Sequence, residues 1–240
     1  MVFRNKGCCP ICEHEVEFCS DHEWFRDHYK CDGCGSIPRE RALMVALESF
    51  YPKWRSLRVH ESSPCRRGVS LKLENECAGY LASHFYAGFP TGTKHPDGFW
   101  CEDLESLSFR NESFDLVITQ DVMEHILNPV LAFVEIARTL KPGGAHIFTV
   151  PLINKDRPSE VRAKRDEQGS IIYLRTAEYH GNPIDPNGSL VCTDWGYDIC
   201  DFIFKASGLF TTMVHIDDIS RGIRAEYIEV LISRKTAIQY

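Results

Sequence analysis

Two pairs of cysteines near the start of the chain constrain its fold more than any other local feature. Cys9 and Cys12 form one CxxC pair, Cys31 and Cys34 form the second, and eighteen residues separate the pairs. Two such pairs can place four thiolates around one tetrahedral zinc ion. Because sulfur would then fill every coordination position, the zinc would stabilise the fold and take no part in chemistry. The pattern predicts a small N-terminal zinc ribbon.

Other interpretations of the cysteines are weaker. Cys8 and His14 lie close enough to act as substitute ligands, but the two-residue gap within each pair favours Cys9 and Cys12. The simpler alternative is a set of buried or disulfide-bonded cysteines. The chain has 11 cysteines, and the seven outside the two pairs follow no pairing pattern. This usage is typical of reduced thiols and favours a cytoplasmic location.

Length and charge limit the class of protein. The 240 residues suffice for one α/β domain with its own core and a small zinc-stabilised unit. No window reaches eighteen apolar residues, and no apolar run precedes the first cysteine, so we expect no membrane association. The net charge of −7 disfavours nucleic acid as a partner, although basic clusters at 66–67 and 157–165 could contact phosphate locally.

Apolar runs bounded by turn residues predict the strands. The run at 114–119 is almost continuously apolar, which is typical of a strand buried on both faces of a parallel sheet. The predicted strands are residues 57–61, 79–86, 114–119, 145–150, 210–216 and 227–232.

Periodicity and cap residues predict the helices between these strands. Apolar positions recur at helical spacing over 39–48, and this helix should join the ribbon to the main domain. Ser63 and Pro64 offer an N-cap and a first-turn proline for the next helix. Asn128 should cap a helix over 130–140, which the Lys-Pro-Gly-Gly turn would end. A further helical face includes Trp195 and ends at Gly208.

The alternation of strands and helices predicts an α/β fold with a doubly wound sheet, whose ligand lies at the carboxyl ends of the strands. We expect a ribbon at 1–38, a connecting helix at 39–56 and a main domain at 57–240. Residues 151–194 are too polar and too long for an ordinary connection. Because they carry apolar and aromatic patches, we interpret them as a lid or substrate-binding insertion.

Three sequence runs carry a resemblance to a known family. They are residues 103–109 (DLESLSF), 113–125 (SFDLVITQDVMEH) and 140–144 (LKPGG). With them the chain resembles a class I S-adenosylmethionine-dependent methyltransferase of the type 11 group, in a subgroup with an N-terminal zinc ribbon. The resemblance covers residues 57–150 well. It implies a Rossmann-like, seven-stranded, mainly parallel sheet and S-adenosylmethionine as cofactor.

The resemblance also implies a set of cofactor contacts. The loop after the first strand, which begins with Glu61, Ser62 and Ser63, would hold the methionine part of the cofactor, although it lacks the glycines usual in the family. The acid that usually binds the ribose after the second strand is also absent, and Ser83 or His84 lies in its place.

Three further contacts follow from the matched runs. Asp103 would accept a hydrogen bond from the adenine amino group, and Leu104 would cover the ring. Gln120 would contact the methionine part at the end of its strand. The simpler alternative for Asp103 is a solvated acidic loop.

Methyl transfer needs alignment of the acceptor with the methyl group and, for some acceptors, a base. The candidates for that role are His180, His125 and Asp121. Each has a simpler interpretation: His180 as a surface loop residue, His125 as a buried residue that braces a helix, and Asp121 as an acid at a helix N-terminus. Other residues able to shape an acceptor pocket are Tyr179, Asp194, Trp195 and Tyr197.

The sequence therefore predicts a methyltransferase whose acceptor is a small molecule, a sugar or a peptide-derived natural product. A binding or scaffold protein with a degraded methyltransferase core is the alternative, because the first loop lacks glycine. An RNA methyltransferase is a weaker alternative, because the chain is acidic. The sequence leaves the oligomeric state open.

Overall fold

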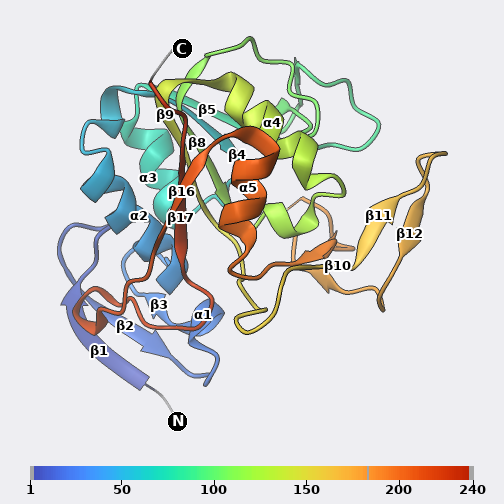
Figure 1. Cartoon of the computed structure of the whole chain (residues 1–240). Helices are drawn as coiled ribbons and strands as arrows, with labels where there is room; N and C mark the ends of the chain where they lie inside the picture. Colours follow the sequence, from blue (N-terminus) through green and yellow to red (C-terminus); the bar gives the residue numbers. More distant parts are fainter. Residues whose placement is uncertain (1–2, 183, 238–240) are drawn as a thin grey trace.

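The main element of the fold is an eight-stranded sheet (Figure 1). The computed structural model describes residues 3–182 and 184–237 of the chain. The sheet consists of β4 (Arg58–Ser62), β5 (Gly79–His84), β6 (Thr93–Lys94), β7 (Trp100–Cys101), β8 (Phe114–Gln120), β9 (Leu140–Thr149), β16 (Phe210–Val214) and β17 (Val230–Arg234). From one edge to the other, the strand order is β16-β17-β9-β8-β4-β5-β7-β6.

Most of this sheet is parallel. Strand β4 pairs in parallel with β5 and β8, β8 pairs in parallel with β9, and β5 with β7. Strand β17 is antiparallel to both of its neighbours, β9 and β16. The predicted mainly parallel, Rossmann-like sheet is confirmed. The two-residue β6, which is antiparallel to β7, raises the number of strands from the expected seven to eight.

Helices cover both faces of the sheet. Helices α2 (Pro38–Phe50) and α3 (Gly68–Glu76) pack on one face, and α4 (Pro129–Thr139) and α5 (Ile199–Ser207) pack on the other (Figure 1). Successive side chains of β8 enter the two cores in turn, since Leu116 belongs to the first hydrophobic cluster and Val117 to the second. This double burial explains why the run at 114–119 is apolar throughout.

Three helix boundaries test the cap predictions. Asn128 caps α4, because its Oδ1 accepts a hydrogen bond from the backbone N–H of Leu131 at 3.3 Å. Gly208 ends α5 in the left-handed conformation, as predicted, although Trp195 is buried before the helix and not within it. The predicted cap at Ser63 is wrong. Helix α3 begins at Gly68, and Ser63 has a positive φ of 58°, which is incompatible with the extended backbone of an N-cap.

The N-terminal unit does not have a separate core. It contains β1 (Phe3–Cys8), β2 (Glu15–Ser20), α1 (Phe25–His28) and β3 (Lys30–Cys31). Its apolar side chains join those of α2, α3 and the sheet in one hydrophobic cluster. The fully buried Arg41 of α2 donates hydrogen bonds to the carbonyl oxygens of Tyr29 in this unit, at 2.8 Å, and of Gly222 near the end of the chain, at 2.6 Å.

Residues 151–194 form short antiparallel pairs beside the main domain, apart from residue 183, which lies outside the described residues. The pairs are β10 (Glu160–Val161) with β15 (Thr193–Asp194), β11 (Ala163–Arg165) with β12 (Ile171–Tyr173), and β13 (Tyr179–His180) with β14 (Ser189–Leu190). The hairpin of β11 and β12 projects away from the body of the molecule (Figure 1). Within the described residues, no helix has the length and apolarity that crossing a membrane would require.

Two histidines are completely buried in the middle of the sheet. The Nε2 atom of His60 lies 2.8 Å from the hydroxyl of Ser83, and Nε2 of His146 lies 2.9 Å from the hydroxyl of Thr119. Burial lowers the pKa of each imidazole to about 3. Both rings are therefore neutral in the folded protein across the physiological pH range.

This burial makes stability depend on pH with a definite sign. An unfolded histidine binds a proton below about pH 6.5 while the buried one does not, so acid favours the unfolded chain. The variant His146→Gln lacks the contribution of this histidine to the pH dependence of the unfolding free energy. As the pH falls from about 7.5 to about 5.5, the wild type should lose about 1.4 kcal/mol more unfolding free energy than this variant. Urea titration at several pH values measures the difference.

The matched control is His28→Gln, which changes an exposed histidine. Its pH profile gives the reference for the loss of a histidine that is in contact with water. Parallel pH profiles of the wild type and His146→Gln would contradict the prediction.

Candidate active site and metal centre

A cavity of about 880 Å³ lies at the carboxyl ends of the central strands, where a doubly wound sheet binds its ligand. Ser62 at the end of β4, His84 at the end of β5 and Gln120 at the end of β8 line it. The loop after β7, the segment 180–182 and residues of the N-terminal unit complete the wall. The cavity is thus enclosed by parts of the chain that are far apart in sequence.

Five of the seven predicted cofactor residues line this cavity. They are Ser62, Ser63, Asp103, Leu104 and Gln120. The Oδ1 atom of Asp103 accepts a hydrogen bond from the backbone N–H of Glu105 at 2.8 Å, which fixes the turn of the acidic loop.

Glu61 lies behind the cavity wall and is not among its lining residues. Its carboxylate is fully buried and accepts hydrogen bonds from Ser70 at 2.6 Å, from Tyr80 at 2.8 Å and from the amide of Gln120 at 2.8 Å. Burial raises the pKa of Glu61. Glu61 therefore acts on the cavity indirectly, because it orients the Gln120 side chain.

Ser83 also lies behind the wall. Its hydroxyl contacts His60, and its carbonyl oxygen accepts a hydrogen bond from the backbone N–H of Ser63 at 2.7 Å. The neighbouring His84 lines the cavity in its place. Burial lowers the pKa of His84 to about 4. A neutral imidazole therefore lies at the place where the resemblance leads us to expect a ribose-binding acid.

Asp121 is held by two arginines that sequence reasoning missed. Its Oδ2 atom lies 2.6 Å from Arg26 and 2.9 Å from Arg39, and its Oδ1 accepts a hydrogen bond from Thr149 at 2.9 Å. The Asp121 side chain is 13% exposed, and this partial burial alone would raise its pKa, yet the two guanidinium groups and this hydrogen bond hold the pKa of its carboxyl at about 2. A carboxylate so strongly engaged is a weak base. The geometry favours a role in holding the N-terminal unit against the cavity.

Asp121→Asn tests this interpretation. Asp121 has a positive φ of 51°, which asparagine also tolerates, so the variant removes the charge without adding backbone strain. Among the described residues, Arg26 and Arg39 would then keep only Asp27 as a counter-ion, and the Asp27 side chain is 45% exposed. We expect the unfolding free energy to fall by about 1 to 3 kcal/mol, between the values for an exposed and a fully buried ion pair. Urea unfolding measures this change.

The matched control is Asp217→Asn, which removes an exposed ion pair with Arg224. Its effect should stay below about 1 kcal/mol. An Asp121→Asn protein with wild-type stability and no methyl transfer would instead favour the predicted catalytic role.

The other two catalytic candidates lie together. The ring centroids of His125 and His180 are 5.3 Å apart, with the rings nearly perpendicular. The Nδ1 atom of His125 lies 2.9 Å from the carbonyl oxygen of Leu190, so it carries the proton and donates it in a hydrogen bond. Burial lowers the pKa of His125, which keeps the ring neutral. Both histidines line the cavity.

Glu124 also lines the cavity, and the sequence predicts no role for it. It is 2% exposed, and neither carboxylate oxygen has a hydrogen-bond partner among the described residues. Burial raises its pKa to about 8. Its Oε1 atom lies 3.7 Å from Nε2 of His125. The Glu-His pair was visible in the sequence, but only the histidine was considered.

The remaining acceptor candidates lie outside the lining. Asp194 pairs with Arg162 at 2.8 Å, and Trp195 is buried in the core. Tyr179 and Tyr197 are exposed and do not line the cavity.

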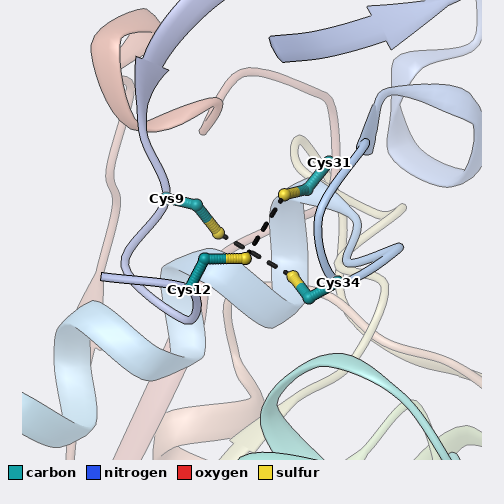
Figure 2. A group of neighbouring side chains, drawn as sticks. All are labelled: Cys9, Cys12, Cys31 and Cys34. Atoms are coloured by element: carbon teal, nitrogen blue, oxygen red, sulfur yellow. Dashed lines mark hydrogen bonds between the residues drawn. The ribbon is translucent and has the colours of Figure 1, made fainter. Parts of the chain in front are cut away.

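The four cysteines converge as the spacing predicts (Figure 2). The sulfurs of Cys9 and Cys34 are 3.9 Å apart, and those of Cys12 and Cys31 are 3.7 Å apart. Sulfurs at the corners of a tetrahedron around zinc, each about 2.3 Å from the metal, would be about 3.8 Å apart. The site is therefore compatible with a structural zinc ion.

Single serine substitutions can establish the ligand set. Cys12→Ser should lose the thiolate charge-transfer absorption of the cobalt-substituted protein and unfold at a lower temperature, because a structural site needs all four sulfurs. Cys8→Ser is the matched control, since Cys8 is exposed and lies outside the cluster. If Cys8→Ser lost the absorption and Cys12→Ser kept it, Cys8 and not Cys12 would be the metal ligand.

Comparison with known proteins supports the predicted class. Residues 90–148 match the family model described as a methyltransferase domain. No curated protein matches the chain. Among solved structures, the S-adenosylmethionine-dependent methyltransferase from Mesorhizobium loti superposes with a TM-score of 0.51 at 16% identity, covering 81% of this chain and 98% of that one.

A second similar structure is the 1,6-didemethyltoxoflavin-N1-methyltransferase of Burkholderia thailandensis, solved with S-adenosylhomocysteine and 1,6-didemethyltoxoflavin bound. Its TM-score is 0.51 at 12% identity, covering 82% of this chain and 78% of that one. The fold is that of the class I S-adenosylmethionine-dependent methyltransferases. The domain match and the fold together support a methyltransferase enzyme, as the resemblance predicts.

Proposed function

We propose that this chain transfers a methyl group from S-adenosylmethionine to a small molecule, a sugar or a peptide-derived natural product. The observation that carries the proposal is a cavity of about 880 Å³, whose wall includes five of the predicted cofactor residues and the two candidate histidines. Such a volume suits one ligand pocket that admits a cofactor and an acceptor together.

The cofactor would lie against the carboxyl ends of the strands. Asp103 offers a carboxylate for the adenine amino group, Leu104 an apolar surface for the ring, and Gln120 an amide for the methionine part. Ser63 supports this arrangement because its positive φ supplies the turn that a glycine makes in related loops, at a cost of about 1 kcal/mol. The cofactor would supply the activated methyl group.

The acceptor would lie on the side of the cavity toward the lid. His125 is the better candidate base there, since its Nδ1 donates to a carbonyl oxygen and its Nε2 retains a lone pair. His180 lies on β13 at the cavity wall and is more exposed. In this proposal residues 151–194 act as the lid, because β13 and the segment 180–182 contribute to the wall.

The cysteines and the net charge support proposals about the metal, the cellular compartment and the acceptor. We propose that zinc at Cys9, Cys12, Cys31 and Cys34 stabilises the N-terminal unit. None of the 11 cysteines, all of which lie within the described residues, forms a disulfide bond, which supports a reducing compartment such as the cytoplasm. The acidic net charge supports an acceptor other than nucleic acid.

A scaffold protein with a degraded core is the second candidate. Two observations favour it: the carboxylate of Glu61 is engaged inside the protein, and His84 lies where a ribose-binding acid is expected. Cofactor binding separates the two candidates.

Isothermal titration of the full chain with S-adenosylhomocysteine should give saturable binding. Asp103→Ala should weaken it about 10-fold to 100-fold, the effect of losing a hydrogen bond to a charged group. Asp201→Ala, on the exposed side of α5, is the matched control and should bind like the wild type. No saturable binding up to about 1 mM would favour the scaffold protein.

A further inference from the structure

Glu124, His125 and His180 bring three potential metal ligands to one point of the cavity wall. One donor atom from each side chain lies within 4.8 Å of the other two. Glu124 and His125 belong to the segment after β8, whereas His180 belongs to β13 of the predicted lid. All three line the cavity, and none belongs to the cysteine cluster.

Among the described residues, no lysine or arginine lies within ion-pair distance of the Glu124 carboxylate, and Arg26 and Arg39 act on it only from farther away. The Glu124 carboxylate is 2% exposed, and its two oxygens have no hydrogen-bond donor within residues 3–182 and 184–237. Because Nδ1 of His125 carries the proton donated to Leu190, its Nε2 presents a lone pair, only 3.7 Å from Oε1 of Glu124. Two acceptors that face each other in a buried site need a cation or a proton between them.

We propose that Glu124, His125 and His180 bind a divalent transition-metal cation in the wall of the cavity. Two imidazoles and one carboxylate form a donor set that suits ions such as Fe²⁺ and Mn²⁺ and leaves coordination positions open. The pair at 3.7 Å fits two ligands that are each about 2.1 Å from one ion. His180 completes the set by a small side-chain movement.

The surroundings of the histidines match those of metal ligands. A ligating histidine commonly donates its second ring N–H to a carbonyl oxygen or a carboxylate, which fixes the ring. His125 does so to Leu190 on β14, the strand paired with β13. The carboxylate of Glu178 lies 3.5 Å from Nε2 of His180, from where it can orient that ring.

Metal binding would have two consequences. It would tie β13 to the segment after β8 and so order the lid. Its open positions would face the cavity, where they would take an oxygen atom of the acceptor and lower the pKa of a hydroxyl group, whose proton leaves to water. This second consequence, which rests on the proposed methyl transfer, selects acceptors with an oxygen donor. With the metal bound, Nε2 of His125 would be a ligand and would not serve as the base.

The test uses the full zinc-loaded chain and Mn²⁺, which prefers nitrogen and oxygen ligands to thiolates. The wild type should remove the paramagnetic resonance signal of free Mn²⁺ in proportion to its concentration. Glu124→Gln and His180→Gln should each raise the dissociation constant for Mn²⁺ by about 100-fold or more. His215→Gln, a change of an exposed histidine outside the cavity, should bind like the wild type.

Two results would overturn the metal site. One is a wild-type protein that leaves the Mn²⁺ signal unchanged, which would mean that a proton occupies the gap between Glu124 and His125. The other is unchanged affinity in both variants. His180 is partly exposed, so His180→Gln keeps the test valid even if Glu124→Gln fails to fold. Because no cofactor is present, the outcome is separate from S-adenosylhomocysteine binding.

Discussion

The buried ion pairs between Asp121 and the two arginines are the interaction on which the cavity depends. Asp121 follows β8 at the carboxyl edge of the sheet, Arg26 belongs to α1 of the N-terminal unit, and Arg39 belongs to α2. Without Asp121, both arginines would depend on Asp27 alone among the described residues, and the Asp27 side chain is 45% exposed. The ion pairs therefore hold the N-terminal unit in the position where it forms one wall of the ligand site.

The polar side chains around the cavity fall into two groups with different consequences. Glu61 and Asp121 have their oxygens engaged by side chains of the protein, so they fix the shape of the wall. Glu124, which is 2% exposed, has no hydrogen-bond partner for either carboxylate oxygen among the described residues. Since a buried charge without a partner is costly, the first group maintains the site and the second is suited to bind a ligand.

Local signals in the sequence predicted much of the fold. The CxxC spacing predicted the cysteine cluster, the apolar run at 114–119 predicted the central strand, and Asn128 predicted the start of a helix, because each depends on neighbouring residues. The cap at Ser63 was wrong since its backbone is left-handed, which composition does not reveal.

Non-local contacts account for what the sequence could not predict in the site. Arg26 is 95 residues from Asp121, and His125 is 65 residues from the carbonyl of Leu190. The lack of a hydrogen-bond donor to Glu124 among the described residues is likewise a result of tertiary packing. Only the tertiary fold determines which of several acidic side chains is left without a donor.

The contacts between the two ends of the sequence have a consequence for biosynthesis. Arg41 donates to the carbonyl oxygen of Gly222, Arg26 to that of Tyr227, and Asn5 to that of Ile219. Strand β17, which lies between β9 and β16, is also synthesised after both of these neighbours. During synthesis the N-terminal segment therefore remains without these partners until residues 219–227 have left the ribosome.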